Sequence, residues 1–567
     1  MTSSTDFHKL SEDCVRRFLH SVVAVDDNMS FGAGSDTFPT DEDINALVDP
    51  DDDPTPIITA SASPRIESTK SKAKVKNHPF DYQALAEAFA KDGIACCGLL
   101  AKSFNVEERD IITASSHKAD ITILDWDMQS DSGQFAIEII KSIIVSDINS
   151  GGRLRLLSIY TGEHVTAVIT KLNNELKKTY RSVIKNDDSI FIEDNYALEQ
   201  WCIVVISKDV YEKDLPNVLI KKFTNLTAGL LSNAALSCIS EIREKTHGIL
   251  TKYNNKLDTA YVSHILNLIK SKESRAYAYE NAHDYAVDLI SEEIRSILQI
   301  SENLKKSLSK NSLSHWPIFH YAKNGCKNFL LTGKKQKDLS VEHLRNILSA
   351  DSLEEIQHAI EHASLGKKEY LSQDGEEDKK LMQLCSLEIT RRSLRYHSHI
   401  DNVSLKQGTL LLDAYNFVYL CIQPLCDSVR LHEKADFLFL RGTLDDNNYN
   451  LLIEDEYGGF YKIKMPAKAS NIISFSFGVE NGNGVIIGKK NNLVNTDYIS
   501  FVPLLVEKIS TPKVLKWIGE IKTTYAQKIT TDIVANLSRI GLDQHEWLRI
   551  KSCLLYTSPS PRDVEES

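Results

Sequence analysis

Four polar features stand directly after four apolar segments in the N-terminal part of the chain. Asp26 and Asp27 follow the first such segment, Asp125 the third, Thr161 the fourth and Lys208 the fifth. Acidic and hydroxyl residues often follow strands simply as turn residues, so each feature alone is weak. If the segments are parallel strands, their carboxyl ends meet at one edge of a sheet and these side chains converge there. The set therefore indicates a single site.

The chemistry that needs these residue types together is phosphoryl transfer to a carboxylate. An aspartate such as Asp125 can attack a phosphoryl group and form an acyl phosphate. The charge that develops on the phosphoryl oxygens calls for a divalent cation, and Mg²⁺ prefers oxygen ligands such as those of Asp26 and Asp27. Lys208 supplies a positive charge for a second phosphoryl oxygen, and the Thr161 hydroxyl can donate to the third.

The residues around Asp125 carry a resemblance to a known family. Ile-Leu-Asp-Trp-Asp-Met is followed by Gly133, and this pattern resembles the phosphoacceptor strand of the receiver domains of two-component response regulators. The resemblance covers about residues 15–235. It implies that Asp125 is the phosphoacceptor and that a sensor histidine kinase or a phosphotransfer protein supplies the phosphoryl group.

The resemblance also implies a Mg²⁺ site. By this resemblance Asp27 binds the metal directly, and Asp26 binds it through a water molecule. Asp125 and the backbone carbonyl of Asp127 would be further ligands.

By the same resemblance Thr161 is the switch hydroxyl and Lys208 the lysine that pairs with the phosphate. The chain departs from the family pattern nearby, because Gln129 and Asp209 stand where proline is usual. Val205 holds the position, three residues before the lysine, that is usually aromatic. The standard coupling between the hydroxyl and the aromatic residue is therefore in doubt.

Strand-like and helical segments alternate through the first part of the chain. Near-continuously apolar strands alternating with helices predict a doubly wound, flavodoxin-like domain with a parallel five-stranded sheet. The strands are expected at residues 20–25, 94–100, 120–124, 154–160 and 201–207, and the helices between them at residues 80–91, 107–116, 134–148 and 163–180.

The whole chain of 567 residues is long enough for about three domains. A helical region and then a smaller α+β domain are expected to follow the receiver-like domain. Helical segments around residues 513–540 would close the β unit of that last domain. The predicted boundaries are residues 1–235 with a mobile insertion at about 28–78, 236–375 for the helical connector or bundle, 376–552 for the C-terminal α+β domain, and 553–567 for a tail that resembles a translated sequencing adapter.

Composition excludes several classes of protein. A net charge of −12 argues against broad nucleic-acid binding, although a local basic patch is compatible with it. The ten cysteines form no CxxC pair, which argues against a standard zinc module and for a reducing compartment. No apolar run approaches the length of a membrane span and the first residues are polar, so the expected location is cytoplasmic.

Three weaker motifs have ordinary structural explanations. His358 to His362 matches H-x-x-E-H, but it follows an ordinary helix start, and we interpret it as a solvated helix rather than a zinc peptidase site. Residues 341–348 and 353–362 could form a helix-turn-helix, but the second helix lacks Arg and Lys, so a packed helix pair is favoured. Cys426 beside Asp427 is interpreted as a buried structural thiol.

A basic cluster lies near the start of the C-terminal domain. It comprises Arg391, Arg392 and Arg395 with Tyr396, His397 and His399. It could bind an anion or a partner, and a solvated helix face explains it equally well.

The sequence therefore predicts a phosphoacceptor response regulator whose C-terminal domain binds a protein partner, or whose receiver buffers phosphate. Its atypical features resemble receivers of bacterial antiviral defence systems, including those of the Detocs type. The alternative is an effector enzyme under receiver control, with an unrecognised active site in the C-terminal domain.

Overall fold

The computed structural model describes most of the chain, which divides into two compact units. Unit 1 comprises Met1–Lys252 and Glu292–Gln373, and unit 2 comprises Tyr253–Ser291 and Asp374–Ser567. The described residues are 2–30, 80–193, 196–270, 275, 278–324, 328–332, 337–364, 370–372, 377–394, 403–429, 431, 433–479, 484–493, 496–504 and 514–537. The predicted insertion, apart from residues 28–30, and the predicted non-native tail lie outside these residues.

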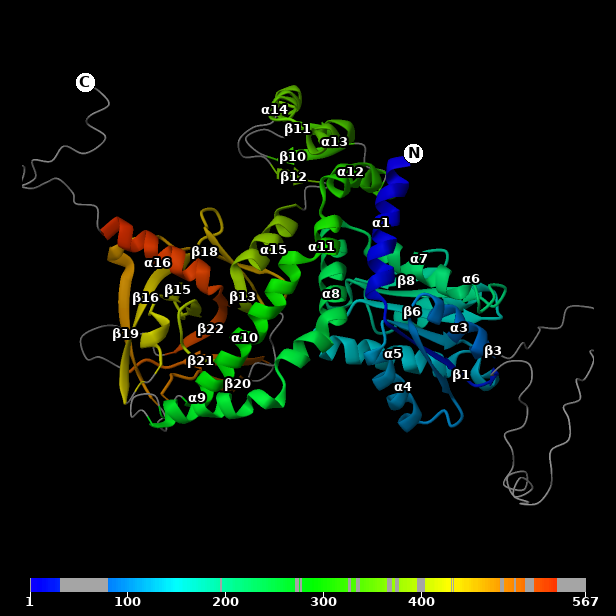
Figure 1. Ribbon diagram of the computed structural model, residues 1–567, viewed down its shortest axis with the longest axis horizontal. Helices are drawn as coiled ribbons and strands as arrows, with labels where there is room; N and C mark the ends of the chain where they lie inside the picture. Colours follow the sequence, from blue (N-terminus) through cyan, green and yellow to red (C-terminus); the bar gives the residue numbers. More distant parts are fainter. Residues whose placement is uncertain are drawn as a thin grey trace, which may run out of the picture. The chain divides into compact units, whose positions relative to one another are not determined.

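Unit 1 is built on a seven-stranded sheet with the order β4-β1-β5-β6-β9-β8-β7 (Figure 1). The first five strands in this order are parallel to one another, and the last two are antiparallel to their neighbours. The parallel strands are β1 (Ser21–Asp26), β4 (Ala95–Leu100), β5 (Ile121–Asp125), β6 (Arg155–Thr161) and β9 (Trp201–Ser207), and the antiparallel ones are β7 (Val183–Lys185) and β8 (Ser189–Ile192).

The sheet therefore has seven strands, two more than the five that were predicted. The additional strands come from the lengthened stretch between Thr161 and Lys208, where the sequence shows only a short apolar run. Ile190 and Ile192 of β8 are buried, and β8 hydrogen-bonds along β9. This burial offsets the weak strand signal of so short a segment.

Helices cover both faces of the sheet, because successive strand residues point to opposite sides. Val23, Leu124 and Val205 face a core shared with α4, α5 and α6. Val22, Ile123 and Val204 face a second core shared with α1, α3, α7 and α8. The bounds are α1 (Thr2–Phe18), α3 (Tyr82–Lys91), α4 (Val106–Lys118), α5 (Gln134–Asn149), α6 (Val165–Leu176), α7 (Leu215–Thr227) and α8 (Leu230–Lys252).

The N-terminal helix α1 precedes the sheet and packs on α7, α8 and α12. Asn233 of α8 donates to the Ser11 hydroxyl at 2.9 Å, and the Phe7 and Phe319 rings lie 4.8 Å apart. The remaining helices up to residue 364 are α9 (Asp258–Lys270), α10 (Ala278–Ile300), α11 (Glu302–Ser307), α12 (Lys310–Asn324), α13 (Val341–Ser349) and α14 (Leu353–His362).

The region predicted as a helical connector or bundle, residues 236–375, also contains a small sheet. Its order is β11-β10-β12, with bounds β10 (Asn328–Thr332), β11 (Lys337–Ser340) and β12 (Tyr370–Ser372). Phe329 and Leu339 are buried with Leu344 of α13 in a satellite core. Strands of three to five residues give too short a periodic signal to be separated from the flanking helices.

Unit 2 contains a ten-stranded antiparallel sheet with a core on each face. The order is β17-β18-β16-β15-β14-β22-β21-β20, with β13 also paired to β22 and β19 to β16. One core includes residues of α15 (Glu377–Ile389) and α16 (Thr523–Leu537), and the other is rich in aromatic side chains. The strands are β13 (Thr390–Ser393), β14 (Thr409–Leu412), β15 (Phe417–Cys421), β16 (Lys434–Leu444), β17 (Leu451–Glu454), β18 (Phe460–Lys464), β19 (Ile472–Gly478), β20 (Lys489–Leu493), β21 (Thr496–Phe501) and β22 (Leu515–Ile521).

The prediction of helical segments around residues 513–540 is wrong for the first part of this range. Leu515–Ile521 is a strand, β22, which lies between β14 and β21, and only the following Thr523–Leu537 is helical. Its sequence, Leu-Lys-Trp-Ile-Gly-Glu-Ile, does not alternate strictly between apolar and polar residues, so periodicity alone does not indicate a strand. Within the described part of the chain, none of the helices has the length and apolar character needed to span a membrane.

Candidate functional site

The carboxyl edge of the parallel sheet brings three of the predicted residues together. Lys208 Nζ lies 2.6 Å from Asp125 Oδ1 and 3.8 Å from Asp26 Oδ2. Asp26 ends β1 and Asp125 ends the adjacent strand β5, while Lys208 follows β9 directly. The two carboxylates are almost fully buried, and the lysine side chain is about a quarter exposed. The site therefore opens to solvent beside the lysine.

Burial raises the pKa of both carboxylates above the usual aspartate value. Burial and, next, the nearby Asp125 charge raise the pKa of Asp26 to about 6. Burial also raises the pKa of Asp125, a shift that Lys208 opposes and the charge of Asp27 reinforces. Two like charges in a low-dielectric site are stabilised by added positive charge. One lysine is present, and the excess negative charge favours binding of a further cation.

Asp27 and Asp127 take their hydrogen bonds from the loop that follows β5. The Gln129 N–H donates to Asp27 Oδ2 at 2.6 Å, and the Ser132 N–H donates to Asp127 Oδ1 at 2.8 Å. Gln129, at a position where the family usually has proline, therefore supplies an N–H that proline lacks. This bond ties the loop after β5 to the end of β1.

Thr161 ends β6 at the same edge of the sheet, and its hydrogen bonds among the described residues go to the backbone. Its hydroxyl is buried and accepts from the Glu163 N–H at 3.0 Å, while its carbonyl accepts from the Lys208 N–H at 2.7 Å. The backbone thus couples the threonine to the lysine. The hydroxyl faces its own loop in this state.

Gly133 is required by the packing of the loop after β5. Its φ is +85°, and a Cβ atom there would lie 2.3 Å from the Trp126 ring. Gln129, Ser130 and Ser132 also have positive φ, a conformation that costs energy in residues with a Cβ. The glycine of the sequence motif therefore permits the tight turn that carries the chain from β5 into α5.

The aromatic residue at this site is Tyr160, which the sequence analysis did not single out. Val205, at the usual aromatic position, is buried in the core under α4, α5 and α6. Lys208 Nζ instead lies 5.7 Å from the centroid of the Tyr160 ring, and the Tyr160 hydroxyl donates to the Val210 carbonyl at 2.6 Å. An aromatic residue directly before Thr161, at the end of a strand, is the signal that could have indicated it.

The donor chemistry of the site suits a hard divalent cation. Asp26 and Asp125 offer buried carboxylate oxygens, and Mg²⁺ is commonly held by one or two carboxylates with water and phosphate oxygens. The described residues contain no group of three or more His, Cys, Asp or Glu side chains arranged to hold a metal ion. The carboxylate pair therefore fits a hard divalent cation such as Mg²⁺ only as a partial ligand set.

The fold and the site together define an α/β domain with an acidic site at the carboxyl ends of its parallel strands. Residues 18–211 match the family model described as response receiver domain. The matched residues, about a third of the chain, are therefore similar to a response receiver domain. No curated protein and no solved structure matches the chain.

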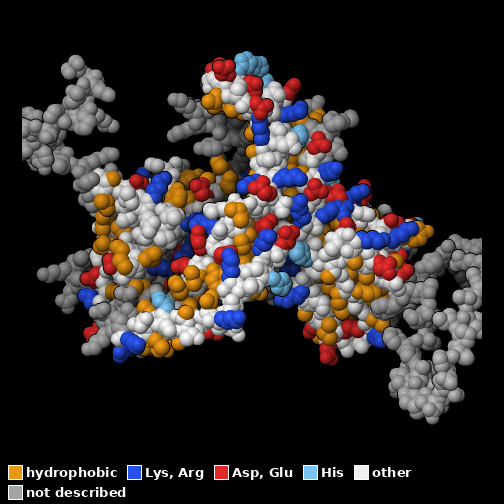
Figure 2. Space-filling model, viewed as in Figure 1, with side chains coloured by type: hydrophobic (Ala, Val, Ile, Leu, Met, Phe, Trp, Pro, Cys, Tyr) orange, Lys and Arg blue, Asp and Glu red, His pale blue; other side chains and the backbone are white. Residues whose placement is uncertain are grey.

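The H-x-x-E-H motif lies on an exposed helix, α14. His and acidic side chains gather over this helix (Figure 2). The His362 ring lies 5.0 Å from the ring of His343 on α13 and 6.4 Å from that of His358. Helices α13 and α14 pack on each other as a pair.

The expectation for Cys426 is wrong, because its thiol is exposed. The residue lies in a 3-10 turn, Leu425–Asp427, beyond the end of β15, where the sheet no longer covers it. Its sulfur lies 3.4 Å from Asp427 Oδ1. In the basic cluster, Arg391 and Arg392 are described, and the residues from Arg395 to His399 lie outside the described part.

Proposed function

We propose that this protein is a response regulator that accepts a phosphoryl group on Asp125 from a sensor histidine kinase or a phosphotransfer protein. The observation that carries the proposal is the 2.6 Å contact between Lys208 Nζ and Asp125 Oδ1, beside the buried carboxylate of Asp26. The order of the five parallel strands supports a flavodoxin-like domain extended by β8 and β7.

The reaction is an in-line displacement at phosphorus. A carboxylate oxygen of Asp125 forms the new bond to phosphorus while the bond from phosphorus to the donor atom breaks, which gives an acyl phosphate. The Lys208 ammonium, already against Asp125, moves to a phosphoryl oxygen. Hydrolysis by water returns the carboxylate and releases inorganic phosphate.

A bound Mg²⁺ would neutralise charge on the phosphoryl oxygens. Asp26, Asp27, Asp125 and the backbone carbonyl of Asp127 are the proposed ligands. The raised pKa of Asp26 supports this assignment, because a carboxylate held near another negative charge gains from a cation.

Thr161 and Tyr160 are proposed to report the phosphoryl group. The Thr161 hydroxyl would leave the Glu163 N–H to donate to a phosphoryl oxygen, and Lys208 would move away from Asp125. Tyr160 contacts both the lysine and the loop before α7, so a movement of Lys208 would be passed through the Tyr160 ring to this loop. Helix α7 packs on α1, which offers a route from the site to the rest of unit 1.

The role that follows phosphorylation is relay to a partner of the C-terminal domain, or buffering of phosphate. A place in bacterial antiviral defence is proposed from the resemblance of the atypical receiver sequence alone.

The test is phosphorylation of the full chain by acetyl phosphate with Mg²⁺, read by intact mass and by the fluorescence change on adding beryllofluoride. The native chain should gain one phosphoryl group, and Asp125→Asn should gain none. Equal labelling of the two chains would refute Asp125 as the acceptor.

The substitution Lys208→Gln tests whether the lysine assists phosphoryl transfer to Asp125. The variant should be phosphorylated about tenfold or more slowly, because a charge-assisted contact to the phosphoryl group is lost. Lys213→Gln is the matched control, since Lys213 is exposed in the same loop. The role of Lys208 would be disproved by equal rates for the two variants.

A further inference from the structure

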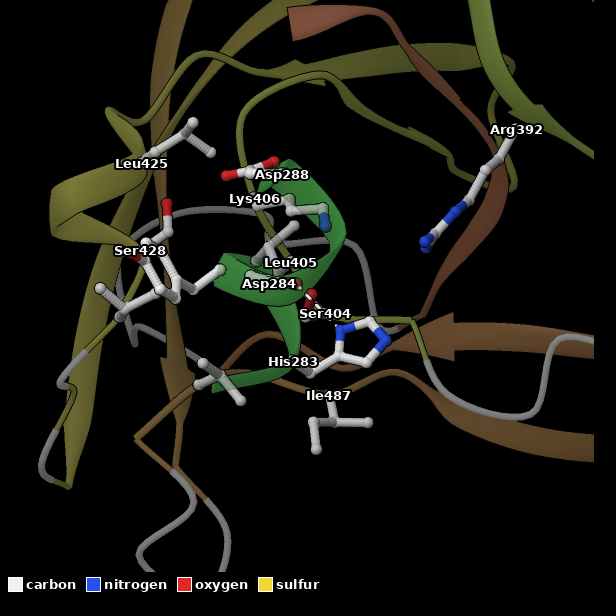
Figure 3. Close-up of a pocket in the computed structure, with 13 residues that line it drawn as sticks. His283, Asp284, Asp288, Arg392, Ser404, Leu405, Lys406, Leu425, Ser428 and Ile487 are labelled. Atoms are coloured by element: carbon white, nitrogen blue, oxygen red, sulfur yellow. Dashed lines mark hydrogen bonds and ion pairs between the residues drawn. The ribbon is translucent and has the colours of Figure 1, made fainter. Parts of the chain in front are cut away.

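A cavity in unit 2 has the size and the mixed lining of a small-molecule site. It encloses about 690 Å³ and lies between the first turns of α10 and the loop that precedes β14 (Figure 3). This volume falls within the range of ligand pockets, which combine apolar walls with a few convergent polar groups. The cavity is remote from Asp125 in the sequence and shares no residue with the receiver site.

Two cationic side chains from the β domain point into this cavity. Figure 3 shows the ends of Arg392 and Lys406 turned toward the same space. Arg392 belongs to β13 and pairs with Glu520 of β22 at 3.6 Å, the residue opposite it in the sheet register. The Arg392 guanidinium is therefore held in place by the sheet and by a buried carboxylate.

The segment that carries Lys406 is fixed through its backbone. The Leu405 N–H donates to the Ile486 carbonyl at 2.8 Å, and the Lys406 N–H donates to the Thr409 hydroxyl at 3.2 Å. Ligand sites on rigid elements are better organised for binding than sites on loops. Hydrogen bonds therefore fix the backbone of both Arg392 and Lys406.

The two cations of the cavity are only loosely paired with carboxylates. Lys406 makes no ion pair with any described residue, and burial, followed by nearby arginines, holds its pKa below the ordinary lysine value despite Glu520 and Asp284. The buried Glu520 carboxylate accepts no hydrogen bond, so it holds Arg392 by charge alone, and the Arg392 N–H groups stay available to a ligand. Half-buried cations without a full set of anionic partners are stabilised when an anion binds.

The other walls suit the body of an amphipathic ligand. Leu405, Leu425 and Ile487 supply apolar surface, and Ser404 and Ser428 supply hydroxyls. Asp284 and Asp288 project from α10 on the remaining side, near His283. Their negative charge opposes an anion, so the charged group of a ligand belongs on the sheet side, against Arg392 and Lys406.

We propose that this cavity binds a small amphipathic anion, whose phosphate or carboxylate group contacts Arg392 and Lys406 and whose ring or alkyl body lies on Leu405, Leu425 and Ile487. An arginine fork suits both kinds of anionic group. The site gives unit 2 a ligand-binding function of its own, independent of whether Asp125 accepts phosphate.

The test is a fluorescence titration of the full chain with 8-anilinonaphthalene-1-sulfonate, an aromatic anion. Saturable binding should weaken about tenfold or more in Arg392→Gln and in Lys406→Gln. Lys468→Gln, an exposed lysine of the same unit, is the matched control and should bind as the native chain does. Asp284→Asn should bind more tightly because a repelling charge is removed.

Competition distinguishes the two kinds of anion. Displacement of the probe by adenosine 5′-monophosphate but not by benzoate assigns a phosphate ligand, the reverse assigns a carboxylate, and displacement by both assigns the shared chemistry. Failure of both to displace the probe would overturn the proposal. So would native affinity in both cation variants, or weaker binding in Asp284→Asn.

The folding of the variants is controlled separately. Arg392→Gln leaves Glu520 buried without its ion pair, and this can destabilise unit 2. The double variant Arg392→Gln with Glu520→Gln removes both charges of the pair. It should fold like the native chain by circular dichroism and still bind the probe about tenfold more weakly, and native affinity there would also overturn the proposal.

Discussion

At the scale of single residues, the buried Asp26 carboxylate carries an energetic cost. Its pKa is raised to about 6, so the folded protein holds its proton more tightly than the unfolded chain does. The stability associated with the neutral form is present below pH 4 and is lost as the pH rises through about 6. At pH 8 the buried charge of Asp26 therefore destabilises the fold.

Asp26→Asn should accordingly raise the stability of unit 1 at pH 8 by about 2–3 kcal/mol, since each unit of pKa shift corresponds to about 1.4 kcal/mol. The gain should disappear near pH 4, where the native carboxyl is already neutral. Thermal unfolding of the two chains at both pH values measures it. Added Mg²⁺ should narrow the difference at pH 8, and a difference unaffected by pH would contradict the assignment.

The sequence predicted the members of this site better than their contacts. Asp26, Asp125 and Lys208 could be predicted because parallel strands bring their carboxyl ends together and the residue types fit one reaction. The importance of Tyr160 was missed, because its role depends on which face of β6 it occupies and on the loop it reaches. The bond from Gln129 to Asp27 likewise depends on a left-handed turn, which one sequence does not specify.

At the scale of elements, one buried ion pair joins α5 to the sheet of unit 1. Arg155 of β6 makes two hydrogen bonds to Asp147 of α5, at 2.9 and 2.7 Å, and both side chains are almost fully buried. Trp201 of β9 donates to the same carboxylate at 3.0 Å, and Arg155 also donates to the Ser116 carbonyl of α4. Two helices and two strands thus share one network of polar contacts.

Asp147→Asn should destabilise unit 1 by about 3–5 kcal/mol, because it leaves the Arg155 charge buried without a counter-charge. Urea unfolding followed by the fluorescence of Trp201 and the other tryptophans measures the loss. Asp110→Asn is the matched control, since Asp110 pairs with Arg109 at the surface, and its effect should stay below about 1 kcal/mol. Similar losses for both variants would count against a structural role for the buried pair.

The elements that could be predicted from sequence are those with long, clean patterns. The strand at residues 201–207 and the helix at 134–149 both occur within a residue of their predicted bounds. The short strands β7, β8 and β10–β12 and the buried strand β22 were missed, because each is stabilised by tertiary pairing rather than by local periodicity. The basic cluster shows the same limit, since only the fold places Arg392 beside Lys406.

At the scale of the whole molecule, α1 is a structural part of unit 1 although it precedes the matched receiver region. The match begins at residue 18, whereas Phe7, Ser11, Cys14 and Val15 of α1 are buried. Cys14 and Val15 cover one face of the sheet together with α7 and α8, and Phe7 packs against Phe319 of α12. A domain trimmed to the match would therefore expose an apolar surface.

Removal of residues 1–17 should lower the thermal stability of unit 1 and increase hydrogen exchange in α7, α8 and α12. The loss should reach several kcal/mol, because each buried side chain removed contributes about 1.5–3 kcal/mol. Removal of residues 1–5, which precede Phe7, is the control and should have little effect. Unchanged exchange in α8 after the longer deletion would refute this role of α1.

The position of α1 in the sequence also determines when its contacts can form during synthesis. Phe7 packs against Phe319, so its partner leaves the ribosome some 300 residues later. At ordinary synthesis rates that is a delay of about 15–60 s. The sheet, α7 and α8 are made earlier and can cover Cys14 and Val15, but Phe7 lacks its aromatic partner until α12 has been synthesised.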